Sequence, residues 1–191
     1  KIDPLMWQVF QALVEHTVNT DLGDGFALKD LQPTQVLKEM PFYMALNEAN
    51  TLELNDLVQS RMPDLPYQPL GYRDLVGHMN GFVDLIAEHQ GRYYVMDYKS
   101  NDLSGDYSQA HLYRKMQQAN YGLQGVIYTL ALHRYLRHRM ADYDYDRHFG
   151  GVRYLFVRGM RAQAPEEGVY AFRPARALIE QLDTLLSGGT L

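Results

Sequence analysis

The chain of 191 residues contains no cysteine. Disulfide bonds and thiolate metal sites are therefore excluded, and we expect a protein of the reducing cytoplasm. No apolar run approaches membrane-spanning length, and no signal peptide is visible at Lys1. A phosphate-binding Gly-x-x-x-x-Gly-Lys-Ser/Thr loop is also missing, so this chain is not an ATP-driven motor.

An excess of positive charge is lacking as well. Eighteen Lys and Arg stand against 23 Asp and Glu, which gives a formal net charge of -5. This balance argues against a module that holds nucleic acid by bulk electrostatics alone. The segment from His133 to His148 is locally rich in His and Arg, and further arginines follow it. It is either a solvated helix face with a surface loop or a phosphate-contacting patch.

The composition is that of a globular domain, with 46% hydrophobic residues, 12% of all residues being aromatic. Helical spacing and β-prone runs alternate along the chain. We expect helices over 4–18, 54–62, 109–139 with a break at 120–122, and 174–186, and strands over 38–46, 81–88, 93–100 and 151–159. This order predicts one α/β domain with a mixed sheet and helices on both sides.

Residues 81–100, GFVDLIAEHQGRYYVMDYKS, hold two aspartates and a lysine within two apolar, β-prone runs. The runs flank Gln90-Gly91, which is typical of a hairpin turn. If the turn is centred there, cross-strand partners have numbers that sum to 181, so Asp84 faces Asp97, and Lys99 projects from the same face. A turn displaced by one residue puts the two aspartates on opposite faces.

These three charges need compensation, because their strand neighbours, Phe82 and Ile86 among them, are apolar and expected to be covered. Opposed like charges destabilise a hairpin, and burying an unpaired carboxylate costs several kcal/mol. A divalent cation bound by both carboxylates offsets this cost, whereas Lys99 alone leaves one negative charge over. A structural salt-bridge network or an exposed strand end is the alternative, and spacing alone does not decide between them.

The spacing of these residues resembles a known nuclease core. Asp84, twelve intervening residues and Asp97-Tyr98-Lys99 are similar to the PD-(D/E)XK motif, and QGVIY supplies a Gln-x-x-x-Tyr pair, Gln124 and Tyr128, on one helical face. The trio of motifs resembles the RecB family of this superfamily. Residues 128–160 and the proline-led last helix extend the resemblance to the nuclease domain of bacterial exodeoxyribonuclease V, from about residue 31 to 186.

The resemblance implies a restriction-endonuclease-like fold and Mg²⁺-dependent hydrolysis of unwound single-stranded DNA, in double-strand-break repair and recombination. It implies that Asp84, Asp97 and the Tyr98 carbonyl bind the Mg²⁺ ion, while Lys99 orients the attacking water or stabilises the transition state. Gln124 and Tyr128 would contact DNA or hold the catalytic groups. Subunits of the RecC and RecD type are the implied partners. A catalytically inactive domain that binds DNA or a sister subunit is the alternative.

One family feature is not found in this sequence: a Gly-x-x-x-His helix ahead of these motifs, whose histidine is a further metal ligand. His16 has Ala12 where the glycine should be, so we expect a surface or packing histidine there. We expect the ligand-bearing helix upstream of Lys1 in a longer parent protein, with residues 1–191 forming a single domain that binds Mg²⁺ loosely and cuts weakly or not at all. Glu39 is a further candidate acid near the metal, and His78 is expected to be structural.

Overall fold

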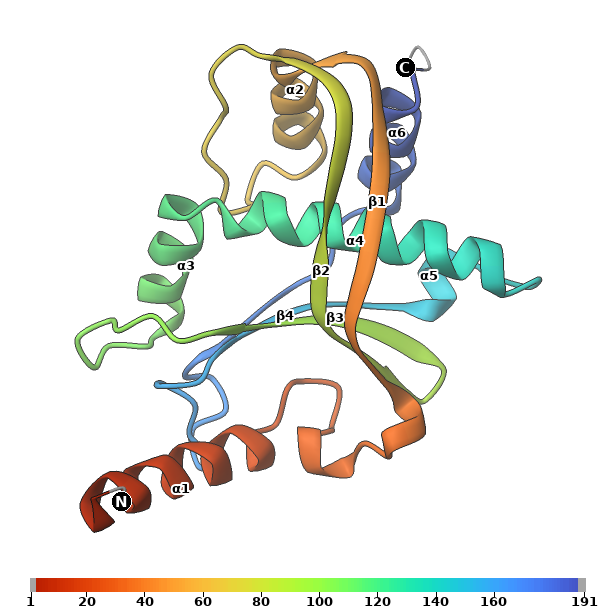
Figure 1. Ribbon diagram of the computed structural model, residues 1–191. Helices are drawn as coiled ribbons and strands as arrows, with labels where there is room; N and C mark the ends of the chain where they lie inside the picture. The colour runs from red at the N-terminus through yellow and green to blue at the C-terminus, as the bar shows by residue number, and fades with distance from the viewer. Residues whose placement is uncertain (1–2, 189–191) are drawn as a thin grey trace.

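A five-stranded mixed sheet with the strand order β1-β2-β3-β4-β5 runs through the molecule (Figure 1). The structure is a computed structural model and describes residues 3–188. The strands are β1 (Val36–Asn50), β2 (Asp74–His89), β3 (Arg92–Lys99), β4 (Phe149–Phe156) and β5 (Val169–Phe172). Strands β3 and β4 are parallel and the other neighbouring pairs are antiparallel. The predicted α/β class with a mixed sheet is confirmed.

Helices stand close to where the sequence predicts them. They are α1 (Pro4–Asn19), α2 (Thr51–Arg61), α3 (Gln109–Gln118), α4 (Tyr121–Arg139), α5 (Tyr145–His148) and α6 (Arg176–Leu186), with 3-10 turns at Leu28–Asp30 and Pro33–Gln35. Asp3 caps α1, because its side chain accepts a hydrogen bond from the Leu5 N–H at 2.9 Å, and Pro4 occupies the first turn. The predicted break between α3 and α4 falls at Asn120, whose φ is 54°.

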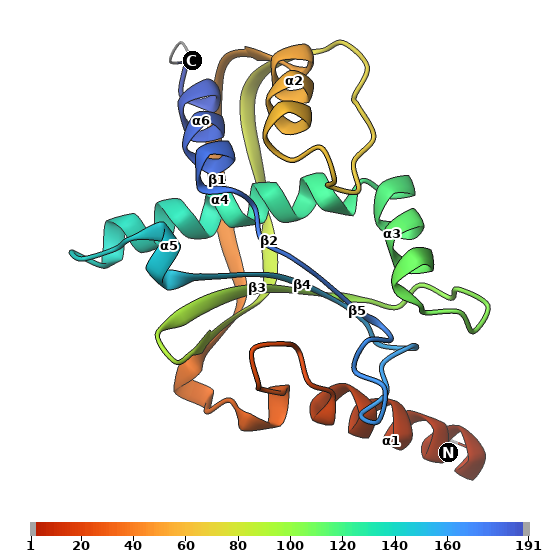
Figure 2. The same cartoon turned by 180° about the vertical axis from the view of Figure 1, so that it is seen from behind.

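Both faces of the sheet are covered where β2, β3 and β4 lie side by side. Helices α2, α4 and α6 lie over one face, and the chain between α1 and β1 lies over the other (Figures 1 and 2). On β3, Val95 packs into the core beneath α2, α4 and α6, whereas Tyr94 and Met96 pack into the core on the opposite face, against the chain between α1 and β1. This alternation follows from the two-residue period of a strand, so Asp97 and Lys99 point to the side of α4.

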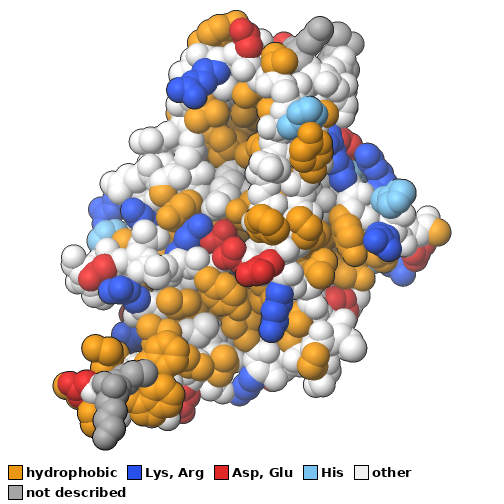
Figure 3. All heavy atoms as spheres, in the orientation of Figure 1, with side chains coloured by type: hydrophobic (Ala, Val, Ile, Leu, Met, Phe, Trp, Pro, Cys, Tyr) orange, Lys and Arg blue, Asp and Glu red, His pale blue; other side chains and the backbone are white. Residues whose placement is uncertain are grey.

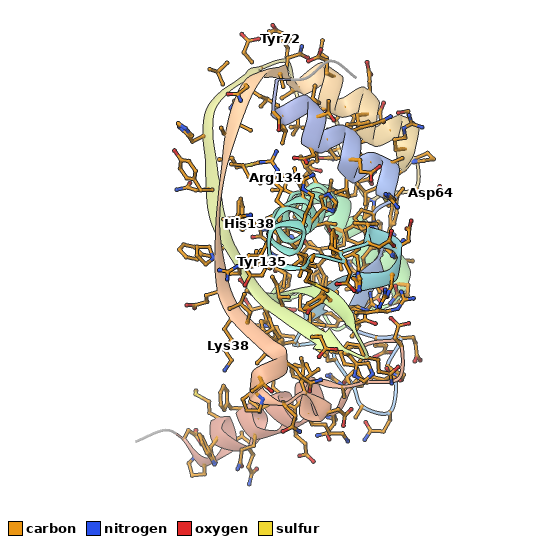
Figure 4. All side chains as sticks on the ribbon, turned by 90° about the vertical axis from the view of Figure 1, so that its right-hand side faces the viewer. Lys38, Asp64, Tyr72, Arg134, Tyr135 and His138 are labelled. Atoms are coloured by element: carbon orange, nitrogen blue, oxygen red, sulfur yellow. The ribbon has the colours of Figure 1, made fainter. Side chains whose placement is uncertain are left out.

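Strands β1 and β2 extend well beyond the rest of the sheet as a curved ribbon, which we call the β1–β2 arm (residues 40–50 and 74–83). Its register runs without interruption from the base to the Leu46↔Gly77 pair, and pairing resumes after a shift toward the Asn50↔Asp74 end. Seen from the side, the concave face of the arm turns toward Arg134, Tyr135 and His138 of α4, and the other face projects side chains away from the body (Figure 4).

The arm corrects one expectation. The apolar neighbours of Asp84 were expected to be covered on both faces, and Ile86 is buried, but Phe82 is 62% exposed. The reason is that β2 is paired with β3 only from Leu85 onward. Residues of β2 before that point belong to the arm, whose outer face no other element covers among the described residues.

Candidate active site

The hairpin between β2 and β3 has the predicted register. Gln90 and Gly91 both have positive φ, 50° and 77°, as a tight two-residue hairpin turn requires. The paired residues from His89↔Arg92 to Leu85↔Met96 have numbers that sum to 181. Asp84 and Asp97 lie one step past the last of these pairs, where the two strands separate.

The separation leaves the Asp84 side chain free to cross between the strands. Its Oδ2 atom accepts a hydrogen bond from the Tyr98 backbone N–H at 3.0 Å. The Asp84 carboxylate is therefore fixed beside the Asp97-Tyr98-Lys99 segment, at the point where β2 and β3 cease to pair. The two aspartates are brought together as the sequence predicts, although they are not a pair of the β-ladder.

Asp97 is the buried charge of the site, with an exposed fraction of 2%. Lys99 Nζ lies 2.6 Å from Asp97 Oδ1, so the buried carboxylate is paired with one ammonium. Burial raises the pKa of Asp97 above its usual range; the ion pair with Lys99 opposes this rise, and the charge of Asp84 adds to it. One ammonium thus faces two carboxylates, which leaves a negative charge over.

Lys99 is held in place by residues of α4 and β4. Gln124 Oε1 accepts a hydrogen bond from Lys99 Nζ at 3.1 Å, and Gln124 Nε2 donates to the Tyr128 hydroxyl at 2.9 Å. The Tyr121 ring lies 4.0 Å below the ammonium as a cation-π partner, and the Tyr154 hydroxyl donates to Gln124 Oε1 at 3.1 Å. The predicted Gln124 and Tyr128 pair therefore reaches the catalytic candidates through Lys99.

Sequence reasoning missed Tyr121 and Tyr154. Tyr121 stands three residues before Gln124 on α4, so helical spacing alone could have found it. Tyr154 lies beside Asp97 in the parallel β3–β4 pair. No local pattern shows a pairing that a long helical crossover creates.

A hollow of about 560 Å³ opens beside Asp84. The β1–β2 pairs Lys38↔Leu85 and Met40↔Val83 flank the position where Glu39 and Asp84 would pair, and that pair is missing because Glu39 has a φ of 50°. Both acids line the hollow together with Lys38, Leu85 and Tyr98. Figure 3 shows acidic side chains gathered at the middle of this face. The structure thus places the candidate Glu39 next to Asp84.

The candidate histidines lie elsewhere. His16 is half-buried in the last turn of α1, and His78 is exposed on the arm, where its ring stacks on Tyr43 with centroids 4.8 Å apart. Neither lines the hollow.

The His- and Arg-rich segment is largely a packing element. Arg134 and Arg137 both pair with Asp183 of α6, at 2.6 and 2.9 Å, and His133 is buried. These contacts show a segment that packs against α6, which differs from the predicted solvated helix face and gives no support to a phosphate-contacting patch.

The donor set fits a hard divalent cation. Within residues 3–188, no three His, Cys, Asp or Glu side chains form a group that could hold a metal ion. The site instead offers two carboxylates, those of Asp84 and the buried Asp97, to the single ammonium of Lys99. Mg²⁺ and Ca²⁺ bind preferentially to oxygen ligands that carry negative charge. Mg²⁺ usually keeps several of its water ligands when it binds to a protein.

Paired acids, a lysine two residues after the second acid, and a mixed sheet that presents them define a nuclease of the PD-(D/E)XK type. The sequence pattern of the PD-(D/E)XK nuclease superfamily matches residues 10–188, so the chain belongs to this superfamily. The predicted restriction-endonuclease-like fold and the family resemblance are thereby confirmed. Nucleases of this superfamily generally depend on a divalent metal.

Within the superfamily, the chain is similar to RecB subunits of the RecBCD enzyme. It is 40% identical to the Escherichia coli subunit over 99% of this chain, and 40% identical to the Haemophilus influenzae subunit over 96% of it. The Mycobacterium tuberculosis subunit is 35% identical over 91% of the chain. The chain spans 16%, 15% and 19% of these relatives, respectively, so it matches less than a fifth of their length. In the described part of the chain, no helix is long and apolar enough to cross a membrane.

Proposed function

We propose that this chain is a Mg²⁺-dependent deoxyribonuclease module that hydrolyses phosphodiester bonds in unwound single-stranded DNA. The observation that carries the proposal is the buried Asp97 carboxylate, paired with Lys99 and accompanied by the second carboxylate of Asp84. A structural ion pair would not need a second acid.

Asp84 and Asp97, with the Tyr98 carbonyl, would hold the cation. When bound there, Mg²⁺ supplies charge neutralisation at the scissile phosphate and lowers the pKa of water. Glu39 lines the same hollow and is a candidate for an additional contact through solvent.

Lys99 stabilises the negative charge that grows on the phosphate oxygens as a water oxygen attacks phosphorus. One P–O ester bond breaks, and the products are a phosphate monoester and a hydroxyl. Gln124 and the Tyr121 ring fix the ammonium from the side of α4, so they act as positioning residues. Tyr128 reaches this set through Gln124, and its part in the site is to hold Gln124 in the orientation that accepts from Lys99.

We further propose that the module works within a RecB-type helicase-nuclease in the cytoplasm, in double-strand-break repair and recombination. Partner subunits of the RecC and RecD type would accompany it. Support for this setting comes from the similarity to RecB subunits and from the net charge of -5, since a nuclease that is fed its strand by a motor need not grip DNA strongly.

The test is cleavage of a fluorescent single-stranded oligonucleotide with Mg²⁺ and with EDTA. We expect the wild-type chain to cut slowly and only with Mg²⁺, and Asp84→Ala not to cut. Asp64→Ala is the matched control, because Asp64 is an exposed acid on the loop after α2, away from the hollow (Figure 4).

Cleavage by Asp84→Ala at the wild-type rate would remove the metal assignment. Oligonucleotide binding without cleavage under any divalent metal, in this chain and in one extended upstream to include a Gly-x-x-x-His helix, would instead favour the inactive, DNA-binding alternative.

A further inference from the structure

The outer face of the β1–β2 arm exposes three flat rings, Phe82, Tyr43 and His78, which we call the ring row. Phe82 is 62% exposed and Tyr43 is 66% exposed. His78 is exposed and stacks on Tyr43. Phe82 precedes Asp84 by two residues on β2, and Tyr43 pairs with Asn80, between Phe82 and His78.

The ring row follows the arm away from Asp84, from Phe82 through Tyr43 to His78. In Figure 3, hydrophobic side chains lie directly beside the central acidic ones over β1 and β2, and a histidine with a hydrophobic neighbour lies farther along the arm. Outward residues on one strand repeat about every 6.6 to 6.8 Å. A strand of nucleic acid whose phosphate reaches Asp84 therefore brings its next bases over the ring row.

The inner face of the arm packs against the body of the protein and so fixes the strands that carry these rings. On this face, Met44 and Val83 are buried in the core. Phe42 lies against Gly81, where a Cβ would come within 2.9 Å of the ring, and the Phe42 ring meets Tyr128 edge-on at 5.8 Å between centroids. The backbone that carries the ring row is therefore anchored to α4, next to the residues that hold Lys99.

The rings do not serve folding, since most of their apolar area stays in water. Bases are the occupant that the surroundings favour. Aromatic side chains bind single-stranded nucleic acid by stacking on successive bases, without sequence preference. With a net charge of -5, the chain has little bulk attraction for phosphates, so stacking is the contact that can hold the strand.

We propose that the ring row is a base-stacking subsite for single-stranded nucleic acid that enters the site of Asp84 and Asp97. The inference rests on the proposed function and deepens it, because it names the part of the substrate that is held and the residues that hold it.

The first test measures binding alone. Fluorescence anisotropy of a labelled oligothymidylate is recorded in EDTA, where cleavage is absent, for Phe82→Ala and Tyr43→Ala. We expect each substitution to weaken the affinity by about 5- to 100-fold, the range for loss of one stacked base. Phe10→Ala, which removes an exposed ring of α1, should leave the affinity unchanged. Phe82→Leu, which keeps apolar area but not a flat ring, should bind as weakly as Phe82→Ala.

The second test reports stacking directly. Trp7 is the single tryptophan, so Phe82→Trp in a Trp7→Phe background gives a chain with one tryptophan in the ring row. Oligothymidylate should quench its fluorescence, and an abasic oligonucleotide of equal length should not, because it offers phosphates without bases. Sedimentation of the wild-type chain at the same concentrations shows whether a second copy covers the ring row instead.

The inference is overturned if the wild-type chain binds no oligothymidylate, if Phe82→Ala and Tyr43→Ala bind it as tightly as wild type, or if the abasic strand quenches equally. Self-association that Phe82→Ala abolishes, with oligonucleotide binding unaltered, would assign the ring row to a protein interface. None of these measurements depends on cleavage, so failure of the subsite is distinguishable from failure of the nuclease assignment.

Discussion

Adjacent strands β3 and β4 each carry one buried charged residue held in an ion pair, Asp97 and Arg153, and the two differ in how completely their charges are compensated. On β4, Arg153 is 6% exposed and pairs with Asp24 at 2.9 Å. Its Nε donates to the Leu22 carbonyl at 2.6 Å and its NH1 group to the Val152 carbonyl at 3.1 Å, while the Tyr94 ring lies 5.1 Å from the guanidinium carbon. Each guanidinium nitrogen of Arg153 thus has a hydrogen-bond partner, and we call this network closed.

On β3, the pair of Asp97 and Lys99 is open. Lys99 is the one cation paired with Asp97, and Asp84 adds a second negative charge that forms no ion pair of its own among the described residues. Charges in a buried site are normally paired, so the second carboxylate needs a reason. The Arg153–Asp24 pair therefore holds the α1–β1 connection against the sheet. The Asp97–Lys99 pair, with Asp84 beside it, has an excess negative charge that the proposed cation would balance.

The largest effect is expected for Asp97→Asn. It keeps the shape of the side chain but removes one of the two ligand charges, so cleavage should fall by about a thousandfold or more. Stability should change less than in the Arg153 variant below, because relief of the burial cost and of the repulsion from Asp84 offsets the lost ion pair. Single-turnover cleavage and urea unfolding measure the two quantities. A large loss of stability would show that the Asp97 pair is structural too.

Lys99→Met removes the ammonium and leaves both carboxylates in place. We expect kcat to fall by about a hundredfold with little change in KM, because the charge is needed in the transition state. Steady-state cleavage rates at several oligonucleotide concentrations provide the check. A loss confined to KM would make Lys99 a substrate-binding residue.

Arg153→Met opens the closed network. The Leu22 carbonyl loses its buried donor, and the free energy of unfolding should fall by about 1 to 3 kcal/mol, whereas cleavage per folded molecule should stay at the wild-type level. Urea unfolding and a cleavage assay on the folded fraction test this. Equal stability with reduced cleavage would reverse the roles of the two pairs.

His133 is a third buried titratable group, and its hydrogen-bond partner, the Tyr143 hydroxyl, is uncharged. Unlike the two ion pairs, it should make the stability of the protein depend on pH near neutrality. Burial lowers its pKa, so below its unfolded pKa of about 6.5 the unfolded chain binds more protons than the folded one. Stability from this group is complete above that pH and is lost as pH falls, by at most about 1.4 kcal/mol per unit. His133→Gln should flatten the dependence of urea unfolding on pH between about 7 and 5. An unaltered slope would place the dependence on other groups.

The sequence predicts much of the site, because the hairpin register is a matter of counting. The turn at Gln90-Gly91 determines which residues face one another, and Asp84 meets the Asp97-Tyr98-Lys99 segment as a result. Gln124 and Tyr128 share a helical face for the same kind of reason.

What could not be predicted depends on contacts between distant parts of the chain. Tyr154 joins the site only because β4 returns parallel to β3. Arg153 follows a His- and Arg-rich segment in the sequence, and it is buried only because the α1–β1 connection supplies Asp24 and the Leu22 carbonyl as its partners. Phe82 has the apolar character of a core residue, and only the point at which β3 ceases to pair with β2 leaves it exposed.

The central claim is that a divalent cation completes the open pair, and Mg²⁺-dependent thermal stabilisation tests it without requiring cleavage. A ligand that binds only the folded state adds about 1.4 kcal/mol at ten times its Kd, which raises Tm by roughly 3 to 6 °C in a domain of this size. We expect wild type and Arg153→Met to show this shift as Mg²⁺ is titrated to saturation, and Asp97→Asn and Asp84→Ala to show little or none. An equal shift in Asp97→Asn, or no shift in wild type, would contradict the account.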